Sequence, residues 1–136
     1  MGNVFAEITV KNAGDIIKAK DGIIAEKDVR SVTMKALVDT GATTLIINEE
    51  LSRQLGLSTV ATRTANLAGG GKGSCNITEP VQIQWKDRFA TVDAIAFPDG
   101  NPLLGVIPLE FMDLIVDPVR RELVGAHGDQ AVMMAM

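Results

Sequence analysis

Residues 36–47 read Ala36-Leu37-Val38-Asp39-Thr40-Gly41-Ala42-Thr43-Thr44-Leu45-Ile46-Ile47, which is two apolar runs with a single carboxylate between them. An Asp-x-Gly triplet taken alone usually marks an exposed turn. The apolar flanks instead predict buried surroundings, in which the charged form of Asp39 loses its water. The carboxylate of Asp39 therefore needs a partner or a chemical purpose.

The residues on both sides of the triplet predict β-strands, and a helix follows them. Residues 31–38 alternate in the period of a strand, and residues 43–47 are β-branched or apolar. Residues 48–56 predict a helix of about two turns, with Asn48 as its N-cap and Gly56 at its end.

The remaining segments are predicted from the same patterns. Strands are expected at residues 4–10, 81–85, 89–97, 114–116 and 122–124, turns at 11–15 and 86–88, and a short helix at 108–112. An apolar pair and a glycine, Leu103-Leu104-Gly105, precede that helix. Residues 16–30 fit either a turn or the start of a short helix, and the pattern does not decide between them.

A glycine-rich stretch, Ala68-Gly69-Gly70-Gly71-Lys72-Gly73-Ser74, lies between two strand-like arms. A phosphate-binding loop would need glycine at position 66 and serine or threonine at position 73, but Asn66 and Gly73 stand there. The alternatives are a linker without a role and a mobile hairpin tip. We expect the hairpin tip, because glycines let a backbone approach a ligand closely.

Composition narrows the functional classes. The chain has 136 residues, is 46% hydrophobic and carries a net charge of −4, so we expect one domain over residues 1–125 and no nucleic-acid partner. Residues 126–136 are expected to form a disordered tail. We find no membrane-spanning or signal-like stretch, and therefore expect a cytoplasmic protein.

The supply of reactive side chains is equally restrictive. Cys75 is the only cysteine and His127 the only histidine. An internal disulfide and a cysteine-rich zinc site are thereby excluded, and no metal or cofactor is expected. His127 lies near a Met-rich end and is expected to be a solvated tail residue.

Taken in order, these features resemble the retroviral-type (retropepsin-like) aspartic peptidases, in particular their small bacterial relatives. The resemblance runs from about Thr33 to Val124 and rests on the Asp-Thr-Gly-Ala motif, the glycine-tipped hairpin, and the later apolar pair with its glycine and helix. It implies an all-β, single-domain, closed acid-protease barrel with one or two short helices, assembled as a two-fold dimer. The part before Thr33 matches little of that family, and Val106 stands where the retroviral enzymes carry a polar or charged residue.

The resemblance also implies roles for individual residues. Asp39 would be the catalytic aspartate, Thr40 would lock its loop against the loop of a second subunit, and Gly41 would lie near the substrate backbone. Leu103-Leu104-Gly105 would support the loop from behind. The residues implied to contact substrate are Ala42 in the loop and Gly69, Gly70 and Gly71 in a flap over the substrate.

Aspartic-type hydrolysis needs two carboxyls that share one proton, one to deprotonate water and one to polarise the carbonyl. The chain has one Asp-Thr-Gly, so we expect a homodimer that sets Asp39 against Asp39 of a second copy. Two functions remain open at this point. One is a homodimeric aspartic endopeptidase acting on extended peptides, and the other is a non-catalytic dimeric peptide-binding module with the same fold.

Overall fold

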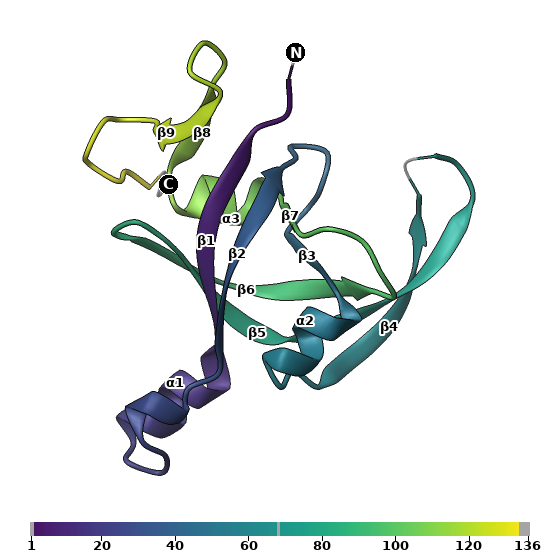
Figure 1. The fold of residues 1–136 in the computed structure, drawn as a ribbon, viewed down its shortest axis with the longest axis vertical. Helices are drawn as coiled ribbons and strands as arrows, with labels where there is room; N and C mark the ends of the chain where they lie inside the picture. Colours follow the sequence, from purple (N-terminus) through teal and green to yellow (C-terminus); the bar gives the residue numbers. More distant parts are fainter. Residues whose placement is uncertain (1, 68, 134–136) are drawn as a thin grey trace.

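The computed structural model describes residues 2–67 and 69–133 (Figure 1). The chain order of its elements is β1 (Phe5–Asn12), α1 (Ala13–Lys20), η1 (a 3-10 turn, Glu26–Asp28), β2 (Ser31–Val38), β3 (Leu45–Asn48), α2 (Glu49–Gln54), β4 (Thr59–Asn66), β5 (Lys72–Trp85), β6 (Arg88–Phe97), β7 (Leu103–Leu104), α3 (Val106–Phe111), β8 (Leu114–Asp117) and β9 (Glu122–Gly125). None of the helices in these ranges is long and apolar enough to cross a membrane.

Six of the strands close into a barrel. The main sheet runs in the order β1-β2-β7-β3-β6-β5-β4, and a second pairing joins β1 to β5. That pairing closes the ring and leaves β4 outside it, attached to β5 as the arm of a long hairpin that projects from the barrel (Figure 1). The expected all-β closed barrel with short helices is confirmed as a mostly β fold, and the described residues contain three short α-helices where one or two were expected.

The barrel interior follows from the alternation seen in the sequence. In β6, and in β5 from Val81 onward, every second residue faces inward, and Val81, Ile83 and Ala94 are fully buried there. Ile8 and Val10 of β1 and Met34 and Ala36 of β2 meet them from the other side of the core. The strands predicted around residues 31–38, 81–85 and 89–97 are therefore present with the expected faces.

The turn predicted at residues 11–15 is wrong, because β1 continues to Asn12 and leads directly into α1. Asn12 is 5% exposed, and its side-chain oxygen accepts the N–H of Asp15 at 3.0 Å as an N-cap. Its amide group also donates to the carbonyl of Leu55 at 2.8 Å. The cap is a local contact, whereas the bond to Leu55 at the end of α2 spans 43 residues and cannot be predicted from the local pattern.

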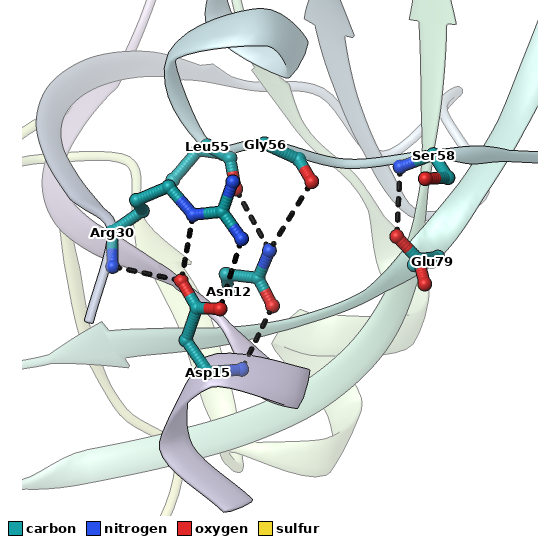
Figure 2. Close-up of polar contacts among 7 residues, drawn as sticks. All are labelled: Asn12, Asp15, Arg30, Leu55, Gly56, Ser58 and Glu79. Atoms are coloured by element: carbon teal, nitrogen blue, oxygen red, sulfur yellow. Dashed lines mark hydrogen bonds and ion pairs between the residues drawn. The ribbon is translucent and has the colours of Figure 1, made fainter. Parts of the chain in front are cut away.

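An ion pair between Asp15 and Arg30 joins the first turn of α1 to the residue that precedes β2 (Figure 2). Asp15 is 3% exposed and accepts three hydrogen bonds from Arg30, from Nε at 2.8 Å, Nη2 at 2.9 Å and the backbone N–H at 3.0 Å. The guanidinium of Arg30 lies against Gly56, so a side chain on residue 56 would collide with it. Hydrogen bonds from Arg30 outweigh burial and lower the pKa of Asp15 to about 2.

We expect Asp15→Asn to lower the free energy of unfolding at neutral pH by about 1–2 kcal/mol. This is less than the full pKa shift would give, because Arg30 is half exposed and solvent screens the ion pair. The folded-state pKa is depressed, so this stabilisation is fully present above the unfolded value near pH 4. It disappears as pH falls through about 2. Urea unfolding of both proteins from pH 7 downward measures the difference. A gap that stays constant down to pH 2 would contradict the assignment.

The C-terminal region is anchored by a residue that the sequence pattern places in a turn. Arg88 begins β6 and is 7% exposed, not part of the turn predicted at 86–88. Its guanidinium donates to the carbonyls of Met112, Asp113 and Gly128. The separation of residues 126–136 as a tail stays a prediction, and its last three residues lie outside the described ranges.

Candidate active site

The loop between β2 and β3 presents Asp39 at one end of the barrel. Asp39 is partly buried, Thr40 and Gly41 are exposed, and Ala42 is 7% exposed. The Asp39 carboxylate accepts the N–H of Gly41 at 2.8 Å, and the backbone carbonyl of Asp39 accepts the N–H of Ala42 at 3.0 Å. These bonds close a tight turn that holds the carboxylate at the surface end of a buried strand. The burial expected for the triplet is therefore only partial at Asp39 and absent at Thr40 and Gly41, and it is complete only at Ala42, the residue after the triplet.

A strand from late in the chain completes the loop. β7 lies between β2 and β3, parallel to the first through Leu37↔Leu103 and antiparallel to the second through Leu45↔Leu104. The N–H of Asp39 donates to the carbonyl of Leu104 at 3.0 Å. The two-residue strand therefore fixes the backbone of the aspartate itself.

Gly105 and α3 hold the loop from behind. A Cβ at Gly105 would lie 2.5 Å from the carbonyl oxygen of Ala42 and closer still to that of Thr44. The first two residues of α3 then donate to the loop, Val106 to the Ala42 carbonyl and Ile107 to the Thr43 carbonyl, both at 2.9 Å. Only glycine fits at position 105, and the helix N-terminus is bonded directly to the loop.

The glycines predicted to form a flap lie at the tip of the β4–β5 hairpin. Gly69, Gly70 and Gly71 are exposed, and Gly70 and Gly71 have φ values of +93° and +79°. The tip is closed by the N–H of Leu67 donating to the Gly71 carbonyl at 3.1 Å. Among the described residues no hydrogen bond joins this tip to the Asp39 loop.

Sequence reasoning missed a groove beside the loop. Its volume is about 370 Å³, and it combines the loop end, outward-facing residues of β5 and β6, and the start of α3. The residues that line it are Thr43, Thr44, Ile77, Thr91, Val92, Asp93, Ile95 and Ile107. Ile77 and Ile95 occupy outward positions in their strands, and only the pairing Ile77↔Ile95 reveals that they meet.

The loop between β2 and β3 carries a single carboxylate, that of Asp39. The only hydrogen bond to the Asp39 carboxylate within residues 2–67 and 69–133 is the one from Gly41. The hydroxyl of Thr40 has no hydrogen-bonding partner in the same ranges. Aspartic-type hydrolysis requires two carboxyls that share a proton, and this loop alone carries one.

Comparisons with known proteins agree with this geometry. The profile of the gag-polyprotein aspartyl protease family matches residues 25–110, which include β2, the Asp39 loop, the hairpin and α3. No match was found among curated proteins. The family match covers the middle of the chain, and β1, α1, β8 and β9 lie outside the matched range.

Comparison with solved structures supports the same fold through one of two matches. The EIAV protease in complex with the inhibitor HBY-793 is 16% identical, with a TM-score of 0.52 over 76% of this chain and 82% of that one. The simian foamy virus (mac) protease, solved in solution, is 14% identical, with a TM-score of 0.45 over 76% and 90% of the two chains. With its family profile, its barrel and its Asp39 loop, the chain belongs to the gag-polyprotein aspartyl protease family, and its fold is that of the retroviral proteases.

Proposed function

We propose that the protein is a homodimeric aspartic endopeptidase that hydrolyses extended peptides in the cytoplasm. The observation that carries the proposal is the Asp39 loop, in which one carboxylate is held at a barrel end by Gly41, β7 and α3. A second copy related by a two-fold axis would supply the other carboxylate. Thr40, whose hydroxyl is exposed beside Asp39, would bond the equivalent loop of that copy.

The chemistry proposed for the pair uses one shared proton. The ionised Asp39 removes a proton from water, and the water oxygen attacks the peptide carbonyl carbon. The protonated Asp39 of the second copy donates its proton to the carbonyl oxygen. The tetrahedral intermediate then breaks at its C–N bond as one of its hydroxyls returns a proton to the Asp39 carboxylate of the second copy, and the proton taken from water passes to the leaving amine.

Substrate binding is proposed to use the Asp39 loop on one side of the peptide and the hairpin tip on the other. A peptide in extended form would lie on Gly41 and Ala42 and under the tip formed by Gly69, Gly70 and Gly71. The groove that includes Ile77 and Ile107 would then receive an apolar side chain of the peptide. Backbone contacts would supply affinity, and this groove would contribute to side-chain preference.

A library of unbiased peptides, cleaved with and without a statine-type transition-state mimic, tests the proposal. We expect cleavage that the mimic blocks, together with a dimer in sedimentation equilibrium of the same preparation. An active preparation that sediments as a monomer at micromolar concentration would overturn the shared dyad. Peptide binding without any cleavage would support the non-catalytic binding module.

A further inference from the structure

Residues 126–133 fold back against the corner between α3 and β8, and we refer to them as the C-terminal strap (Figure 1). Three of the hydrogen bonds that hold the strap end on Asp113. Its backbone carbonyl accepts the N–H of Ala126 at 2.9 Å. Its carboxylate accepts the N–H of Val132 at 3.0 Å and lies 2.7 Å from Nδ1 of His127.

Asp113 is built to make these contacts. Its φ is +55°, a left-handed conformation that aspartate and asparagine tolerate better than most residues. The buried guanidinium of Arg88 donates to the Asp113 carbonyl at 2.8 Å and to the strap carbonyl of Gly128 at 2.7 Å. The Asp113 side chain is only 12% exposed, whereas that of His127 is 58% exposed. A fixed carboxylate therefore faces a titratable ring that water reaches freely.

The strap also lies along an apolar groove. Val132 and Met133 line it together with Ile107, Phe111 and Ile115, the last three of which are about half exposed. Apolar contact gives the strap a weak, pH-independent attachment. The polar attachment at Asp113 is the part that can change with pH.

We propose that the strap is a pH-dependent latch, which His127 tightens when its imidazole is protonated and loosens when the ring becomes neutral. A charged imidazolium donates a stronger hydrogen bond to the Asp113 carboxylate than a neutral ring does. Histidine side chains change charge between about pH 5 and 8, so the latch would respond in that range. The hydrogen bond from His127, followed by that from the Val132 N–H, holds the pKa of Asp113 below its ordinary value, which keeps its carboxylate ionised throughout.

Other charged groups lie near the pair of His127 and Asp113. Arg88 on β6 faces the Asp113 backbone and stays cationic. Glu110 on α3 shares the apolar groove with Asp113, and Asp129 in the strap shares a neighbouring groove with Arg88. Aspartate, glutamate and arginine side chains as types ordinarily keep their charge between pH 5 and 8, whereas histidine is the type that changes charge there.

Amide hydrogen exchange measured residue by residue by NMR tests the latch, with each rate divided by its chemical rate at the same pH. In the wild type we expect the protection of the Val132 and Ala126 amides to fall roughly two- to fivefold between pH 5.5 and 8. His127→Gln keeps a hydrogen-bond donor without a titrating charge and should abolish this fall. Asp113→Asn keeps the backbone conformation and should abolish it as well.

Asp129→Asn serves as the matched control, because it removes one exposed charge from the same strap and should leave the fall unchanged. Protection in the wild type that is constant with pH would overturn the latch, as would a fall that persists in His127→Gln. An equal fall at the core amide of Ile83 would indicate global unfolding and would also overturn it. None of these measurements depends on proteolytic activity, so the latch and the proposed function fail independently.

Discussion

Asp39→Asn is expected to reduce kcat/KM for peptide cleavage by about 10²- to 10⁴-fold, because an amide cannot act as the general base that activates water. The fold should survive the change. The carboxamide oxygen can still accept the N–H of Gly41, which closes the turn at 2.8 Å in the present loop. Initial rates on a peptide that the wild type cleaves, together with thermal unfolding of both proteins, measure the two effects.

Asp21→Asn provides the control for charge, since Asp21 follows α1 at the far end of the barrel from the Asp39 loop (Figure 1). It should cleave at the wild-type rate. A mixing experiment adds a sharper test, because mixed dimers would contain one intact carboxylate. Addition of excess Asp39→Asn protein should therefore inhibit the wild type. Activity that is merely additive in the mixture would show that each chain works alone, against the shared dyad.

Gly105→Ala is expected to destabilise the protein by about 3 kcal/mol or more, a large share of the stability of an ordinary domain. The new methyl group would enter the space occupied by the backbone carbonyl oxygens of Ala42 and Thr44. Backbone atoms cannot rotate away as a flexible side chain does, so β7 and the loop would have to separate. Urea unfolding monitored by the fluorescence of the single tryptophan, Trp85, measures the change.

Gly69→Ala is the matched control for stability, because a Cβ at that position has no atom within 4 Å. It should alter the unfolding free energy by less than about 0.5 kcal/mol. If Gly105→Ala unfolded with the same midpoint as this control, the close contact of β7 with the loop would be refuted.

Sequence alone located the loop because its signal is local. Asp39 stands between two apolar runs, and Leu103-Leu104-Gly105 is an apolar pair that ends in glycine before a predicted helix. Both parts could therefore be identified from neighbouring residues. The hairpin tip could likewise be predicted from its run of glycines. The roles of Asp39, Thr40 and Gly41 in catalysis, and of Ala42 and the hairpin glycines in binding, stay predictions that the proposed experiments address.

Other features were hidden because they depend on pairs distant in the chain. The cap that Asn12 makes on Asp15 is local, but its bond to Leu55 spans 43 residues. Arg88 leaves the turn because three carbonyls from the C-terminal region surround its guanidinium. His127 is more than half exposed, as expected for a tail residue, but the carboxylate that binds it lies 14 residues away. Contacts of this kind are decided by the barrel and leave no mark in local periodicity.

The position of β7 has a consequence for how the protein is made. β2 and β3 are complete by Asn48, yet the strand between them is Leu103–Leu104, so all of β4, β5 and β6 leave the ribosome before it. Contacts between such distant segments require closure of a long loop and slow the folding of a domain. A growing chain carries Asp39 for most of its synthesis without the strand and glycine that shape its loop. The carboxylate site is therefore among the last parts to assemble, and a chain cut before residue 105 ends before it is built.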